Sequence, residues 1–235
     1  SGLEVCDDIC LTEAVPSGLI NLLEQGEVDA ALCSSIDYQQ STVPLVILPA
    51  PSLGCIGATK TVRLYSTMPF ETLDEVSCDS DSHTSVVLLQ VLLREGYSRQ
   101  VKVVPFDAEV ENVEWPPAVM LIGDKVISGS PPPGHYPYQM DLGEAWHELT
   151  GLPFLFGIWL AGTDLDPVDA RRIVSILDRQ HRYNRVHSET LVGRESRARN
   201  WPQDTAEEYL SSGIRYEFGQ LQREGLERFF ELAAA

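Results

Sequence analysis

Residues 141–159, with the sequence DLGEAWHELTGLPFLFGIW, decide the fold class that we predict for this chain. Asp141 precedes a segment with helical periodicity, and Glu144 follows it at the spacing of a capping box. Residues 152–160 are apolar without alternation, as expected for a strand that is covered on both faces. The stretch therefore predicts a capped helix followed by a buried strand.

Strand-like and helix-like segments alternate along the rest of the chain as far as Asp166. The apolar strand-like segments are residues 28–33, 43–48, 61–65, 76–78, 101–105 and 118–122. One helix is expected to begin with Ser17 as its cap, and another covers residues 86–93 and stops at Gly96. Because strands and helices alternate, we expect an α/β fold with parallel pairing. After Asp166 the chain is predicted to be nearly all helical, with Pro167 in a first turn.

Composition and charge exclude several classes of partner. The 235 residues are enough for one large domain or two modest ones, and 43% of them are hydrophobic. The formal net charge of −18 argues against nucleic acid and against anionic membrane surfaces, which bind clustered Lys and Arg. No apolar run reaches the roughly 18 to 20 residues of a membrane span. A small anionic ligand stays compatible with this charge, because helix N-termini act locally.

The five cysteines predict neither a disulfide framework nor a metal site. They are odd in number, scattered, and free of any C-x-x-C spacing. The sequence starts at Ser1, and Leu3 and Val5 alternate like the edge of a strand. We therefore give the absence of a signal peptide little weight.

Polar turns follow three of the predicted strands, and ligands of α/β proteins bind where such turns meet at the carboxyl ends of strands. The candidate ligand-binding residues are Ser34, Ser35, Ser82, His83, Thr84, Ser85, Gly123, Asp124 and Asp141. The segment of residues 79–85 precedes a helix, so it suits a carboxylate or phosphate, and ordinary capping by Ser82 or Thr84 is the equal alternative. His83 is interpreted either as an acid or base or as a solvated loop histidine.

The candidates for a catalytic role are Ser85 and Asp141. Asp141 has the alternative role of helix cap, and sequence alone does not separate the two. No residue stands out as a dedicated base.

Several stretches of this sequence resemble the chorismate dehydratases of the futalosine menaquinone pathway and occur in the same order. They are SSIDY at 34–38, SHTSV at 82–86, LIGD at 121–124, DLGEAW at 141–146 and a tail at 209–232 that contains IRY and GLERFF. Residues 146–159, WHELTGLPFLFGIW, closely resemble the family's W-x-x-x-T-G-L-P-F-x-F-x-x-W. The resemblance covers the chain from about residue 15 to its end.

This resemblance implies a two-lobed α/β fold like the periplasmic binding proteins (type II), with a ligand cleft between the lobes. Lobe I would comprise residues 1–73 and 155–235, and lobe II residues 74–154. It also implies a cytoplasmic hydro-lyase that converts chorismate, a small-molecule dicarboxylate, to 3-[(1-carboxyvinyl)oxy]benzoate and water. No metal and no organic cofactor is implied, and a homodimer is compatible with the sequence. The substrate's own carboxylate is one candidate for the base.

Two other functions compete with this hypothesis. One is a non-catalytic solute-binding protein for a small carboxylate, which has the same fold. The other is dihydroxynaphthoate synthase of the same pathway, which shares the D-L-G-E segment. Ser35-Ile36-Asp37 and Thr84-Ser85 fit the dehydratase better.

The start of the sequence departs from the family pattern. Members open with a strand that carries S-Y-L-N, whose Asn faces the cleft, and no matching segment occurs in this sequence. The expectation is that lobe I has one strand fewer and the cleft one polar contact fewer, which would affect activity.

Overall fold

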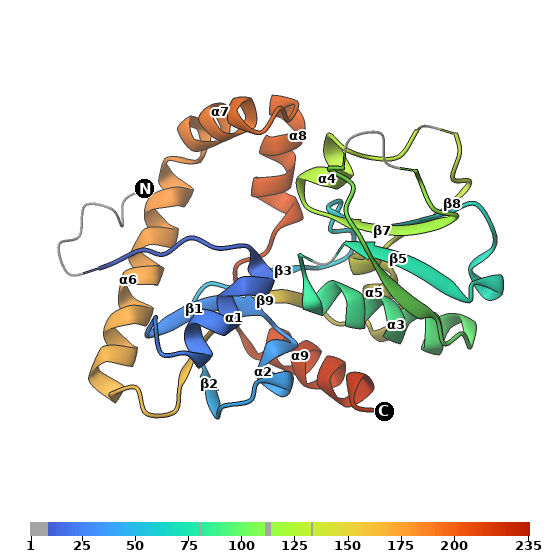
Figure 1. The fold of residues 1–235 in the computed structure, drawn as a ribbon. Coiled ribbons are helices and arrows are strands. Elements are labelled where there is room, and N and C mark those ends of the chain that lie inside the picture. The colour runs from blue at the N-terminus through green and yellow to red at the C-terminus, as the bar shows by residue number, and fades with distance from the viewer. Residues whose placement is uncertain (1–8, 80, 111–113, 133) are drawn as a thin grey trace.

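The computed structural model describes residues 9–79, 81–110, 114–132 and 134–235, and these form two lobes, each built around its own sheet. The lobes lie side by side, with the C-terminal helix running along the base of both (Figure 1). Leu3 and Val5, predicted at the edge of a strand, lie outside the described residues. The α/β class is confirmed.

The first sheet is organised around one strand, β9 (Phe154–Gly162), and the buried strand predicted at residues 152–160 is thereby confirmed. It pairs antiparallel with β1 (Ala30–Ser34), β2 (Leu45–Ile47) and β3 (Leu53–Cys55). Helices α1 (Pro16–Glu24) and α9 (Gln220–Ala233) contribute Ile20, Leu23 and Leu226 to the apolar core of this lobe. Helix α1 begins at Pro16 with no side-chain cap, so the expected cap at Ser17 is wrong.

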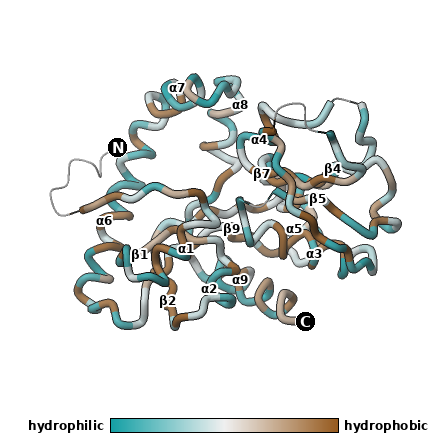
Figure 2. The backbone as a smooth tube through the Cα atoms, viewed as in Figure 1, coloured by the Kyte–Doolittle hydropathy of each residue, from teal (hydrophilic) through white to brown (hydrophobic). Residues whose placement is uncertain are grey.

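The second sheet has the strand order β6-β5-β7-β4-β8. Its strands are β4 (Val62–Ser66), β5 (Glu75–Asp79), β6 (Lys102–Phe106), β7 (Ala118–Ile122) and β8 (Tyr138–Asp141). Helices α3 (His83–Tyr97), α4 (Asp124–Ile127) and α5 (Leu142–Thr150) complete this lobe. Hydrophobic residues run through its central strands (Figure 2).

Parallel pairing is limited to part of this second sheet, so the expectation of general parallel pairing is wrong. Strand β5 is parallel to β6 and β7, whereas β4 is antiparallel to β7 and β8. The alternation rule applies to consecutive strands joined by a helix, and β5-α3-β6 is such a unit. The predicted lobe boundary at residues 73/74 falls inside this sheet, because β4 precedes it in sequence.

The crossing between the lobes is made by the stretch that predicted the fold. Helix α5 ends at Thr150, and Gly151 adopts a positive φ of 72°, which turns the chain toward β9. The Trp146 indole N–H donates to the Pro153 carbonyl at 3.1 Å. Trp146 also packs edge-on against Phe154 and Phe229, with centroids 5.2 and 6.1 Å away. All three rings are essentially fully buried, so strand β9, helix α5 and helix α9 share one core.

The long C-terminal segment is helical, as predicted. It contains α6 (Pro167–Val186), α7 (Ser188–Ala198), α8 (Gln203–Glu208) and a π-helical turn, Tyr209–Gly213. These elements run up one side of the molecule and across its top in Figure 1. Two short helices complete the described elements, namely α2 (Asp37–Gln40) and a 3₁₀ turn, Phe70–Thr72. No helix in the described part of the chain is long and apolar enough to cross a membrane.

Gly225→Ala should destabilise the protein by about 3 kcal/mol, because the added methyl group would displace Pro153, the residue that precedes β9. A Cβ at residue 225 would overlap the Pro153 carbonyl oxygen, which already accepts the Trp146 hydrogen bond. Urea unfolding measures the change. Gly193→Ala in α7 is the matched control, since its Cβ would meet nothing within 4 Å and should add about 0.5–1 kcal/mol. Equal effects of the two substitutions would contradict this account.

Candidate functional site

Two of the predicted polar turns meet where the lobes touch. Ser35 follows β1 in one lobe, and Thr84 lies in the first turn of α3 in the other. Their hydroxyl oxygens are 3.3 Å apart, the Ile36 N–H donates to Thr84 Oγ1 at 3.1 Å, and Ser35 donates to the Leu155 carbonyl at 2.7 Å. Both side chains are fully buried. The sequence thus identified a real junction, whose hydroxyls are already paired within the protein.

Ser82 and Ser85 form the N-terminal cap of α3. The Ser82 Oγ accepts from the Ser85 N–H at 3.3 Å and from the Ser85 hydroxyl at 3.1 Å. Capping by Ser82, which was the alternative interpretation, is therefore confirmed. Ser34 is the last residue of β1 and is buried beside this region.

Asp37 joins His83 at the same junction, and sequence reasoning did not select it. His83 Nδ1 lies 2.7 Å from Asp37 Oδ1, with Asp37 only 3% exposed and the His83 side chain 40% exposed. Burial raises the pKa of the Asp37 carboxyl, and the hydrogen bond and positive charge of His83 oppose only part of that shift. The Ser34-Ser35-Ile36-Asp37-Tyr38 stretch held the available signal, because Asp37 begins α2 two residues after Ser35.

Lys125 connects two further turns and was also missed. Its Nζ lies 2.7 Å from Asp81 Oδ2 and 3.1 Å from Asp79 Oδ1. Burial alone would lower the pKa of the Lys125 ammonium, but the hydrogen bonds and charges of the two aspartates outweigh it and raise that pKa. One cation against two carboxylates leaves this corner negative. Lys125 therefore neutralises part of the negative charge that precedes the N-terminus of α3.

Gly123 and Asp124 form hydrogen bonds with residues other than those of the Ser35–Thr84 junction. The Gly123 N–H donates to the Thr61 carbonyl at 2.7 Å. Asp124 accepts from the Trp201 indole N–H at 3.0 Å and from Arg199 at 3.2 Å. The Asp124 carboxylate thus ties the C-terminal helices to the second lobe.

Asp141 acts as the cap that the sequence predicted. Its Oδ1 accepts from the backbone N–H groups of Thr59, Gly143 and Glu144, at 2.9, 3.0 and 3.1 Å. Its Oδ2 accepts from the Lys60 N–H at 2.7 Å. Four backbone donors occupy a buried carboxylate, so we assign Asp141 to holding the loop before β4 against α5. Glu144 takes part through its backbone N–H.

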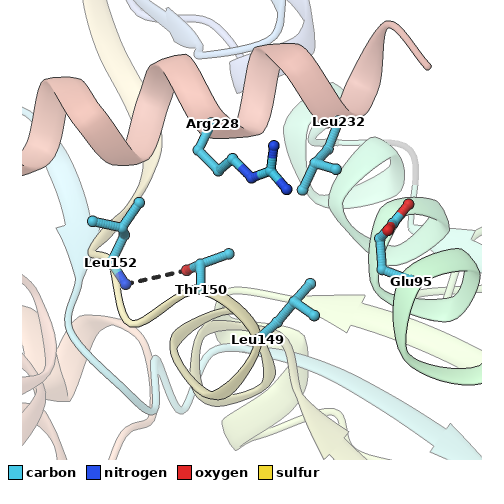
Figure 3. Close-up of a pocket in the computed structure, with 6 residues that line it drawn as sticks. All are labelled: Glu95, Leu149, Thr150, Leu152, Arg228 and Leu232. Carbon is cyan, nitrogen blue, oxygen red and sulfur yellow. Dashed lines mark hydrogen bonds between the residues drawn. The ribbon is translucent and has the colours of Figure 1, made fainter.

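A cavity of about 300 Å³ lies away from these turns, between α3, α5 and α9. It is lined by Glu95, Leu149, Thr150, Leu152, Arg228 and Leu232 (Figure 3). None of the nine predicted ligand-binding residues lines it. The Thr150 hydroxyl there accepts from the Leu152 N–H at 3.1 Å, which stabilises the turn into β9.

The model of a family described as menaquinone biosynthesis matches residues 1–235. The chain belongs to the menaquinone biosynthesis family. This confirms the resemblance noted in the sequence. Chorismate dehydratase of Thermus thermophilus is 28% identical over 237 residues, which cover 93% of this chain and 84% of that protein.

Solved structures show the fold of this menaquinone biosynthesis family member. A protein of Archaeoglobus fulgidus has a TM-score of 0.69 and 16% identity, with 95% of this chain and 84% of that chain covered. The periplasmic aliphatic sulphonate binding protein of Escherichia coli has a TM-score of 0.54 and 14% identity, with 92% and 79% covered. The two-lobed, binding-protein-like fold is therefore confirmed.

Thr84→Val should destabilise this menaquinone biosynthesis protein by about 1–3 kcal/mol. Valine removes Oγ1 and leaves the buried Ile36 N–H without its acceptor. Thr84→Ser is the control, because it keeps an oxygen at the same position. Urea unfolding compares the three proteins, and a serine variant as unstable as the valine variant would contradict the hydrogen-bond explanation.

Asp37→Asn should remove a pH dependence of stability. The pKa of Asp37 in the native state is raised above 3.8, its ordinary value in an unfolded chain. At any pH between 3.8 and the native pKa, the native state therefore binds more protons than the unfolded state. The stability from this group is complete below pH 3.8 and is lost as pH rises through the native pKa. Unfolding free energies measured from pH 4 to 7 should therefore fall less steeply in the variant. A steeper fall would contradict the assigned direction.

Proposed function

We propose that this protein is a chorismate dehydratase of menaquinone biosynthesis, acting in the cytoplasm on the futalosine route. The observation that carries the proposal is the family match over residues 1–235, together with the similarity to the Thermus thermophilus chorismate dehydratase. The reaction would convert chorismate to 3-[(1-carboxyvinyl)oxy]benzoate and water. Formation of an aromatic ring supplies much of its driving force.

The substrate's two carboxylates require donors rather than further acid. The N-terminus of α3 supplies backbone N–H groups and the positive end of a 15-residue helix, with the Ser82 and Ser85 hydroxyls beside it. We propose that one carboxylate binds at this helix start. Ser35 and Thr84 would not contact the substrate but would hold this helix start in position, through the hydrogen bonds that join the lobes.

We propose that the ligand lies in a cleft between the lobes, which close over it. Closure would exclude water and hold the substrate in a reactive conformation. The sheets suggest a second lobe that begins with β4 and ends with α5, and the chain would cross between lobes before β4 and again at β9. The lobes would then be joined by the segments around residues 59 and 151.

A non-catalytic binding protein is the second candidate function. The similarity of fold to the sulphonate binding protein of Escherichia coli favours it. Such a protein would bind chorismate tightly and leave it unchanged. The dehydratase assay therefore separates the two functions directly.

Chorismate incubated with the protein should lose one molecule of water, which ultraviolet absorbance and mass spectrometry both record. Ser85→Ala should lower kcat/KM roughly 10- to 100-fold, because a hydrogen bond to a charged group contributes about 1.5–3 kcal/mol. Thr84→Ala should also lower kcat/KM, because it removes the hydroxyl that accepts the Ile36 N–H where the lobes meet.

Ser211→Ala, an exposed serine in the π-helical turn, is the control and should leave turnover unchanged. Unchanged turnover in both the Ser85 and the Thr84 variant would refute the binding place at α3. If the unaltered protein bound chorismate without removing water from it, the proposed dehydratase activity would be refuted.

A further inference from the structure

The cavity of about 300 Å³ between α3, α5 and α9 lies between the two lobes. Helix α9 packs into the core of the first lobe, whereas α3 and α5 belong to the second. Leu149, Leu152 and Leu232 supply the apolar part of its wall (Figure 3). Its volume is at the small end of the range for ligand pockets, so it suits a molecule smaller than most cofactors.

All three helices reach this cavity with their C-terminal turns. Helix α3 ends at Tyr97, α5 at Thr150 and α9 at Ala233. The last carbonyl groups of a helix lack helical partners and carry the negative end of its dipole, so they attract N–H donors and cations. The Arg94 guanidinium already donates to the Leu232 carbonyl at 2.6 Å. The helix ends therefore favour a positively charged ligand group.

Glu95 adds a carboxylate from the last turn of α3. Its Oε1 accepts from the Arg94 Nε–H at 2.8 Å, and its Oε2 forms no hydrogen bond with any residue that the structure describes. The Glu95 side chain is 35% exposed, so it is partly shielded from water. An ammonium group in the cavity would thus have both a carboxylate oxygen and helix-end carbonyls as acceptors.

Arg228 supplies the opposite charge from α9. Figure 3 shows its guanidinium directed from the helix into the cavity. Its Nη1 donates to Glu231 at 3.0 Å, and its remaining N–H groups form no hydrogen bond within the described part of the chain. A guanidinium has five N–H donors in a planar arrangement that matches a carboxylate. The wall therefore holds donors for a ligand carboxylate as well.

Thr150 shapes the wall but does not contribute to binding. Its hydroxyl donates to the Trp146 carbonyl at 2.8 Å and accepts from the Leu152 N–H at 3.1 Å. Because the single hydroxyl proton is used within the protein, Thr150 fixes the turn that carries Leu152. The polar specificity of the cavity thus depends on Glu95 and Arg228.

We propose that this cavity binds a free amino acid with an apolar side chain, such as L-leucine. The ammonium group binds Glu95 and the helix-end carbonyls, the carboxylate binds Arg228, and the side chain contacts the three leucines of the wall. The ligand links the lobes, because α9 binds one of its ends and α3 the other. Glu95 lies about 16 Å along α3 from Thr84, so this site is separate from the proposed substrate place. The inference does not depend on the dehydratase function.

Isothermal titration calorimetry with L-leucine tests the ligand class. Isocaproate lacks the ammonium group, isoamylamine lacks the carboxylate and glycine lacks the side chain. Each should bind about 10-fold more weakly than L-leucine, because each loses one charge-assisted hydrogen bond or the apolar contact. Absence of L-leucine binding would overturn the site. An equal Kd for isocaproate or isoamylamine would overturn the assignment of a zwitterionic ligand.

Substitutions at the two charged residues test where the ligand binds. Arg228→Met and Glu95→Gln should each raise the Kd for L-leucine about 10-fold, since each removes one charge from the wall. Leu149→Trp, at a 41% exposed position, fills the cavity and should abolish binding. Arg182→Met on α6, whose Arg182 side chain is 66% exposed, is the control and should leave the Kd unchanged. Circular dichroism verifies that each variant is folded. An unchanged Kd in both Arg228→Met and Glu95→Gln would overturn the proposal.

Discussion

The Pro153 carbonyl is one of the points at which the two lobes are held together. It accepts the Trp146 indole N–H, and the backbone of α9 at Gly225 approaches it so closely that only glycine fits there. Phe154 follows at once and packs between Trp146 and Phe229. A polar contact inside an aromatic cluster is strong and directional, because water does not compete for it. This contact lies directly before β9, the strand with which β1, β2 and β3 all pair.

The parts of the fold that could be predicted are those with a local signal. The capped helix and apolar strand at residues 141–159 carry their own cap, periodicity and turn, and the structure has all three. Strands β3 and β8 carried none: β3 has three residues around Gly54, and β8 has two exposed residues and two buried ones. Such short strands form because a neighbouring strand offers free backbone groups, which sequence does not record. The predicted parallel pairing was wrong for the same reason, since β9 is far in sequence from the strands with which it pairs.

The candidate site was predictable in its outline and unpredictable in its charges. Ser35 and Thr84 were found because polar turns follow strands, and the two turns do meet although they are 49 residues apart. Asp37 and Lys125 were missed because each acquires its role from a partner in a distant segment, His83 in one case and two aspartates in the other. Asp141 shows the opposite problem. Its sequence context allowed both capping and catalysis, and its four backbone donors show the capping.

The Ser35–Thr84 junction and the Trp146–Pro153 contact both involve the beginning of β9. This links the arrangement of the lobes to the Asp37–His83 contact. Ser35 donates to the Leu155 carbonyl at the beginning of β9, while the next residues bring Ile36 to Thr84 and Asp37 to His83. A rotation of one lobe about the start of β9 moves His83 with α3 but leaves Asp37 with β1. A 2.7 Å contact tolerates little such movement. The buried Asp37 carboxyl therefore loses its hydrogen bond to His83 whenever the lobes separate, so the contact itself favours the joined arrangement.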